Sequence, residues 1–162
     1  MDAPGRPTSQ GRSDWERQQD ERRFEEGAVQ LPPYPKPGDL IEFRPFGSSS
    51  LRFFIDRASI GIGPGAVRYT LVTRNASGTE SASHEGIRCG ARAYRLYALG
   101  QRDGTWKQVQ TEWRDKEPGW SRVLRREFFC RGDVAIQTVE EGLEALRAGG
   151  HNMRRDAVNR HE

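Results

Sequence analysis

The chain has 162 residues and a mass of 18.4 kDa, which is enough for one domain with its own hydrophobic core. Its 26 basic and 23 acidic side chains give a net charge of +3 without any block of one sign, so the composition argues against a concentrated basic surface for nucleic acid. No run of 18 apolar residues occurs, which excludes a transmembrane helix, and the opening MDAPGRPTSQ lacks the apolar core of a signal peptide.

The two ends of the chain are too polar to pack by themselves. Residues 1–30 are rich in Gln, Arg, Glu and Asp, with Trp15 and Phe24 as the large apolar groups of the charged stretch, and they predict a disordered tail. The prolines of LPPYPKPGD, from Leu31 onward, predict a stiff spacer at the start of the domain. We therefore expect one domain over residues 31–150 and a second disordered tail over residues 151–162.

Apolar and polar residues alternate through most of the predicted domain. This period of two is typical of half-buried antiparallel strands, which we expect within residues 39–46, 51–58, 66–74, 80–88, 94–99 and 105–110. Turn residues at 75–78 (NASG) and at Asp103-Gly104 indicate hairpins between successive strands. The glycine-rich stretch SIGIGPGAV predicts a bulged hairpin, because Pro64 interrupts it and no helix follows, as a phosphate-binding loop would require.

The period changes to that of a helix after Pro118. Trp120, Val123, Leu124 and Phe128 recur at helical spacing and predict an amphipathic helix, with Arg122, Arg125 and Arg126 on its outer side. A second helix carries Ile136, Val139, Leu143 and Leu146 on one face, with a capping box at Thr138 and Glu141 and a stop at Gly149. The predicted fold is α+β, with a five- or six-stranded antiparallel meander packed by two C-terminal helices.

The two cysteines, Cys89 and Cys130, allow several interpretations. A zinc site is disfavoured because it needs about four ligands at local spacing. A thiol nucleophile is disfavoured because His84, the nearest base to Cys89, does not face it along a strand. Two separate buried thiols, or a disulfide that pins the first helix to the sheet, remain. A stable disulfide would favour an oxidising compartment, which is the periplasm for a bacterial chain.

A set of motifs in fixed order resembles a known family. LPPYPKPGDLIEF, RFFIDRASIGIGPGAVRYTLVTR, SGTESASHEGIRC, AYRLYALG, DGTW and REFFC together resemble the cryptic neisserial protein family, a group of small exported proteobacterial proteins of unknown activity. The resemblance covers about residues 31–150 and implies an exported protein. Cys89 and Cys130 match the family's cysteine positions, which supports their pairing. The family supplies no catalytic residue.

Three classes of function compete. The first is a binding protein without catalysis, in which Arg68, Glu85, Arg88 and Tyr94 form an anion-binding face, because guanidinium groups pair with carboxylate or phosphate through two hydrogen bonds. Their convergence would need a bulge near Gly86, since residues 85 and 88 of a regular strand point to opposite faces. The alternative is a solvated sheet face with cross-strand ion pairs such as Glu85 with Arg68.

The second class is a small hydrolase with Ser83, His84 and Asp56 as its triad. This is disfavoured because Ser83 and His84 are consecutive strand residues, whose side chains point to opposite faces. The third is a cytoplasmic protein that binds RNA or another polyanion, with bases stacked on Phe53, Tyr69 and Tyr94. The alternating positions of these aromatic residues are better explained by a place in the core. We therefore expect a periplasmic or envelope-associated interaction protein without catalysis, cofactor or metal. Its partner would be an envelope protein or an anionic ligand, and nucleic acid is not the expected partner.

Overall fold

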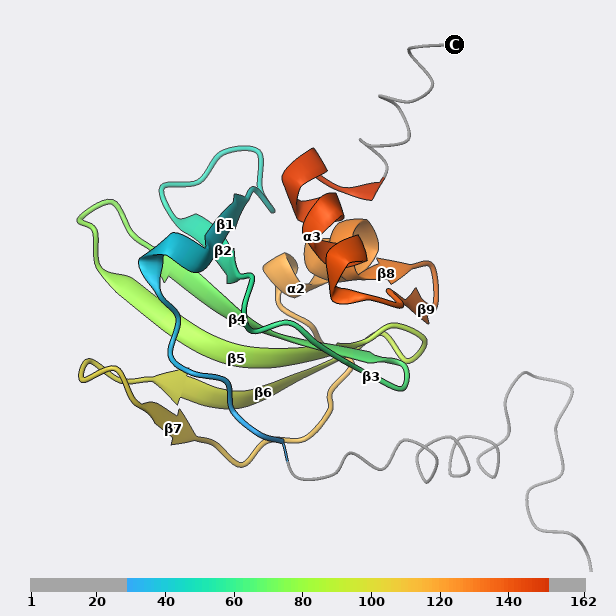
Figure 1. The fold of residues 1–162 in the computed structure, drawn as a ribbon, viewed down its shortest axis with the longest axis horizontal. Coiled ribbons are helices and arrows are strands. Elements are labelled where there is room, and N and C mark those ends of the chain that lie inside the picture. Colours follow the sequence, from blue (N-terminus) through green and yellow to red (C-terminus); the bar gives the residue numbers. More distant parts are fainter. Residues whose placement is uncertain (1–28, 152–162) are drawn as a thin grey trace, which may run out of the picture. The chain divides into compact units, whose positions relative to one another are not determined.

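The structure is a computed structural model and describes residues 29–151, so the two predicted tails lie outside the described residues except for Val29, Gln30 and His151. Within this range seven strands form one antiparallel sheet in the order β1-β2-β4-β5-β6-β7, with β3 beside β4 (Figure 1). A single 3-10 turn (Pro37–Asp39) precedes them. The strands are β1 (Leu40–Phe43), β2 (Arg52–Asp56), β3 (Gly61–Gly63), β4 (Ala66–Arg74), β5 (Glu80–Arg88), β6 (Ala93–Gly100) and β7 (Trp106–Gln108).

The sheet has one strand more than the sequence predicted. The additional strand, β3, forms the short hairpin expected from the glycine-rich stretch and pairs with the first part of β4, while β2 pairs with its last part. Between these two pairings the side chain of Ser59 accepts the backbone N–H of Thr70 at 2.8 Å. The glycines of this stretch give no alternation of apolar and polar side chains, so the sequence did not indicate the strand β3, although it correctly predicted the hairpin.

The C-terminal elements cover one face of the sheet (Figure 1). A short α-helix, α2 (Gly119–Val123), widens into a π-helix, η2 (Leu124–Phe129), and a small hairpin of β8 (Cys130–Arg131) and β9 (Val134–Ala135) leads to α3 (Val139–Ala148). The predicted α+β arrangement with two C-terminal helices is confirmed, although the first helix changes its winding at Leu124.

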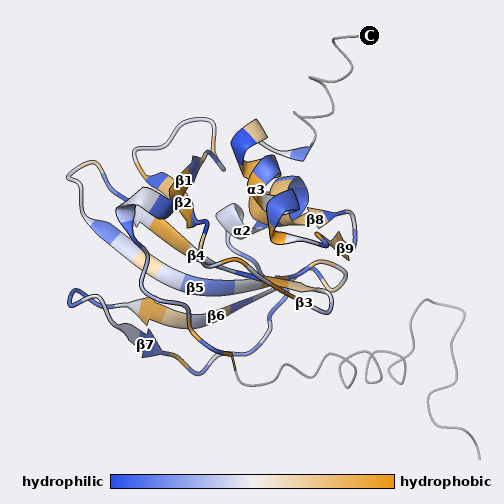
Figure 2. Cartoon of the chain, viewed as in Figure 1, coloured by the Kyte–Doolittle hydropathy of each residue, from blue (hydrophilic) through white to orange (hydrophobic). Residues whose placement is uncertain are grey.

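The main core lies between the sheet and this helical layer. Sheet and helix residues contribute in the predicted alternation, and both β2 and α3 carry hydrophobic stretches in Figure 2. The core includes Phe43, Phe53, Ile55, Val67, Tyr69, Leu71, Ile87, Leu124, Phe128, Phe129 and Leu146. Both ends of α3 are capped as predicted. At its start Thr138 Oγ1 accepts the N–H of Glu141 at 3.2 Å, and at its end Gly149 has φ 85°.

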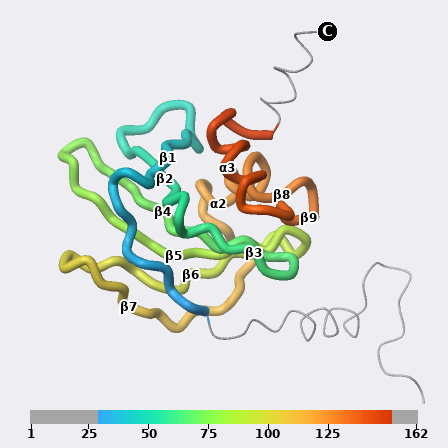
Figure 3. The backbone as a smooth tube through the Cα atoms, in the orientation of Figure 1, coloured from blue at the N-terminus to red at the C-terminus, as the bar shows by residue number. Residues whose placement is uncertain are grey.

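The proline-rich stretch packs against the opposite face of the sheet instead of acting as a free spacer. The indole N–H of Trp106 donates to the carbonyl of Pro32 at 2.9 Å, and the Tyr34 ring lies 5.2 Å from the Trp106 ring. A smaller apolar cluster forms beneath it, from Phe54, Val72, Ala82, Tyr34, Leu40 and Trp106. Figure 3 shows this segment, which we call the proline strap (residues 31–36), crossing the sheet.

His151, predicted to begin the C-terminal tail, belongs to the packed part of the chain. Its Nε2 lies 2.8 Å from the carbonyl oxygen of Phe128 in the π-helix, so the imidazole can satisfy a carbonyl at that helix. Among the described residues no helix is long and apolar enough to cross a membrane.

Candidate functional site

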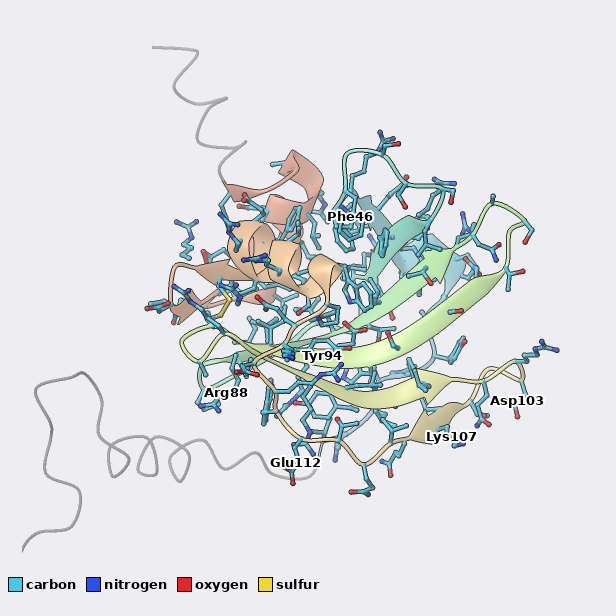
Figure 4. The ribbon with its side chains drawn as sticks, turned by 180° about the vertical axis from the view of Figure 1, so that it is seen from behind. Phe46, Arg88, Tyr94, Asp103, Lys107 and Glu112 are labelled. Carbon is cyan, nitrogen blue, oxygen red and sulfur yellow. A yellow bond between two sulfur atoms is a disulfide. The ribbon has the colours of Figure 1, made fainter. Side chains whose placement is uncertain are left out.

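A disulfide joins Cys89, which directly follows β5, to Cys130 at the start of β8 (Figure 4). Both residues are buried, their Cα atoms are 5.8 Å apart, and the N–H of Cys89 donates to the carbonyl of Gly65 at 3.2 Å. The bond between these cysteines that the sequence favoured is therefore present. It fastens the end of the π-helix to the sheet, and it excludes both the zinc and the thiol-nucleophile interpretations.

The four residues predicted to form a binding face divide between the two faces of the sheet. Tyr69 pairs with Glu85 and Ile87 pairs with Tyr94, which places Glu85 and Tyr94 on the side of the helical layer. Arg68 pairs with Gly86, so Arg68 and Arg88 belong to the opposite side. The structure brings Glu85 to Tyr94, but it does not bring either of them to the arginines.

The irregularity expected near Gly86 lies in the neighbouring strand. β5 pairs with β4 without interruption from Glu80 to Arg88, whereas its pairing with β6 shifts between His84 and Glu85 and leaves Tyr97 as the extra residue. The bulge puts Ala98 on the same side as Arg95 and Tyr97, which corrects the strict alternation predicted for this strand. Gly86 is required for a different reason, because a Cβ there would lie 2.8 Å from Cε2 of the Tyr97 ring.

Glu85 is a buried acid at the centre of the domain. Its side chain is 1% exposed and accepts hydrogen bonds from the hydroxyl of Tyr69 at 2.9 Å, the hydroxyl of Ser83 at 2.7 Å and the indole N–H of Trp120 at 3.0 Å. Burial raises the pKa of Glu85, and the hydrogen bonds from Ser83, Trp120, Tyr69 and Tyr94 oppose that shift in part. The carboxyl group thus links α2 to the sheet through Trp120.

The two tyrosines beside Glu85 have shifted pKa values of the same origin. Burial raises the pKa of Tyr69 well above its usual value, and the neighbouring Glu85 charge raises it further. The pKa of Tyr94 is also raised, first by burial and then by Glu85. Both phenols are therefore protonated donors toward the carboxyl group, and this cluster forms a structural centre beneath the helical layer.

The opposite side of the sheet carries a cluster of arginines and aromatic rings, which we call the arginine face: Arg68, Arg88, Arg95, Tyr97 and Trp113. The guanidinium carbons of Arg68 and Arg95 lie 5.7 and 5.1 Å from the Tyr97 ring centroid, and that of Arg88 lies 5.8 Å from the Trp113 ring. The rings of Tyr97 and Trp113 meet edge to face at 6.3 Å. Cation–π contacts of this kind hold the guanidinium groups in place.

Sequence reasoning found Arg68 and Arg88 but missed the other members of the arginine face. The alternation correctly placed Tyr97 on the same side as Arg95, but it did not show that the Tyr97 ring would lie against Gly86 of the neighbouring strand. Trp113 lies in a segment without strand periodicity, and the adjacent Arg114 exchanges backbone hydrogen bonds with Tyr94 at 2.8 and 3.0 Å. This pairing along β6 is what brings the indole to the sheet, and no local signal marks it.

The hypothetical Ser83–His84–Asp56 triad does not form. Ser83 donates to Glu85, whereas His84 Nδ1 lies 3.0 Å from Thr70 Oγ1, and Asp56 accepts the N–H of Ala58 in a turn. Burial, and then the charge of Arg68, lower the pKa of His84 to about 4. Within residues 29–151 no group of three or more His, Cys, Asp or Glu side chains could hold a metal ion.

The fold and these sites define a small α+β domain with a disulfide between its sheet and its helical layer. The profile of the CNP1-like family, a family of unknown function, matches residues 19–147, and the chain belongs to that family. No curated protein and no solved structure matches the chain.

Proposed function

We propose that the protein acts without catalysis, in the periplasm or associated with the cell envelope, and that it binds an anionic partner through the arginine face. The observation that carries the proposal is the gathering of three guanidinium groups and two aromatic rings on one side of the sheet, over Gly86. Guanidinium groups pair with carboxylates and phosphates through two parallel hydrogen bonds.

The proposed location has separate support. A disulfide that closes 41 residues of chain is typical of proteins that fold in an oxidising compartment. The resemblance to the cryptic neisserial proteins, which are exported, supports the same compartment. Intact-mass measurement after blocking free thiols tests it, because protein from its native compartment should carry no blocked cysteine.

Binding can be tested with defined polyanions. Short polyglutamate and short polyphosphate chains, titrated into the full-length protein by calorimetry, should bind more weakly as salt rises, because exposed charges are screened over about 8–10 Å near physiological ionic strength. The variant Arg88→Ala should weaken this binding. A matched control, Arg122→Ala, removes the same charge from an exposed position on α2 and should leave binding unchanged. Equal effects of both variants would show that only net charge matters, and the arginine face would not be the site.

A further inference from the structure

A hollow of about 240 Å³ opens in the loop that joins β1 to β2, away from the arginine face. Phe46, which lines the hollow, and Arg88, on the arginine face, are labelled at separate places in Figure 4. The loop residues 47–50 are glycine and serines, whose small side chains leave the space open. The hollow is lined by Glu42, Phe43, Arg44, Pro45, Phe46, Gly47, Ser49, Leu51, Arg52 and Phe53.

Part of this lining is apolar and yet exposed to solvent. Phe46 is 42% exposed and Leu51 is 36% exposed, and both line the same hollow. The Phe46 ring is nevertheless fixed in position. It stands edge-on to the Phe53 ring at 5.6 Å, and it lies so close to Gly119 that a Cβ there would be 3.0 Å from two of its carbons. The hollow therefore has a preformed apolar wall.

The rim of the hollow carries two arginines, Arg44 and Arg52, and one carboxylate, Glu42, so one positive charge is in excess. Arg52 donates from Nε and Nη2 to the two carboxylate oxygens of Glu42, each at 2.9 Å. Arg44 is exposed, and among residues 29–151 no carboxylate lies within ion-pair distance of it. A carboxylate beside the apolar wall would complete this arrangement, because guanidinium groups bind carboxylates through two hydrogen bonds.

We propose that this hollow binds the carboxylate end of a peptide chain whose last residue is apolar. Arg44 would hold the terminal carboxylate, and the last side chain would pack against Phe46 and Leu51. The size favours this occupant, because the hollow of about 240 Å³ is smaller than the roughly 300–1,000 Å³ of sites that enclose whole small molecules. A long acyl chain would leave most of its apolar length in water, whereas a peptide can leave through the open side.

The test uses the isotope-labelled full-length protein and the peptide acetyl-Gly-Gly-Leu, as the free acid and as the amide. We expect saturable shifts of the amide resonances of Phe46, Gly47 and Ser49 with the acid, and about tenfold weaker binding of the amide, since only the acid can pair with Arg44. The variant Arg44→Gln should lower the affinity for the acid to that for the amide. The control Arg122→Gln, with the same loss of charge, should bind like the wild type.

Three results would overturn this proposal. The first is equal binding of acid and amide, the second is unchanged binding by Arg44→Gln, and the third is the lack of saturable shifts up to about 10 mM peptide. Octanoate provides a further comparison, because tighter binding of octanoate than of the peptide would assign the hollow to free fatty acids. None of these outcomes depends on the arginine face, so this proposal and the proposed function can fail separately.

Discussion

Removal of the Cys89–Cys130 disulfide should destabilise the domain strongly. The bond closes a loop of 41 residues, and in the chain-entropy model its loss returns about 13 cal/mol/K to the unfolded chain, or about 4 kcal/mol at 25 °C. Domains of this size are stable by about 5–15 kcal/mol in total. With only 34% hydrophobic residues, this chain has few other means of compensating for the loss.

The double variant Cys89→Ala/Cys130→Ala tests this magnitude by urea unfolding, followed by circular dichroism. We expect the free energy of unfolding to fall by about 3–5 kcal/mol and the m-value to rise, because the unfolded chain without the cross-link exposes more surface. Ser48→Ala/Ser50→Ala, at two exposed loop positions, is the control and should change little. A loss below about 1 kcal/mol, with the wild type shown to be oxidised by mass, would refute the reasoning.

Three further predictions concern the core and its buried ionisable groups. Leu124→Ala should cost about 2–5 kcal/mol because Leu124 is fully buried, whereas exposed Arg122→Ala should cost little in the same urea experiment, and equal costs would contradict this packing. Folding lowers the pKa of His84 from 6.5 to about 4, so the stability that neutral His84 contributes is complete above pH 6.5 and is lost as the pH falls toward 4. The variant His84→Gln should therefore flatten the pH dependence of the unfolding free energy between these values. An unchanged slope would contradict this prediction. Folding raises the pKa of Glu85, so the stability that the protonated carboxyl contributes is complete below the ordinary pKa and is lost as the pH rises through the raised pKa. The variant Glu85→Gln should remove this loss of stability with rising pH. A slope that persists in the variant would contradict this prediction.

One expectation from the helical pattern needs correction. The spacing put Arg125 on the outer side of the first helix, where a substitution would cost little. In the structure the Arg125 guanidinium makes an ion pair with Glu117 at 2.6 Å, and the two side chains are only 11% and 10% exposed. Removing one partner of such a pair leaves the other charge poorly solvated, so Arg122 is the proper exposed control.

Local patterns in the sequence were sufficient for much of the fold. The alternation in β2 and β4 correctly separated the core residues Phe53, Ile55 and Val67 from those on the other face, because side chains of a strand point alternately to its two sides. The capping residues of α3 predicted both of its ends, since a helix end is satisfied by residues next to it in the chain. The presence of only two cysteines, together with the family resemblance, also predicted the disulfide between Cys89 and Cys130.

The candidate sites depended on contacts that are distant in the sequence. The bulge at Tyr97 is a property of the pairing between β5 and β6, and it cannot be recognised from the alternation of β6 alone. The proline strap looked like a spacer because its partner, Trp106, lies 74 residues beyond Pro32. Glu85 looked like a surface acid because Trp120, which donates to it, is 35 residues away. Sequence periodicity indicates on which side of a strand a residue lies, but only the tertiary packing decides what covers that side, and therefore which charged groups are buried.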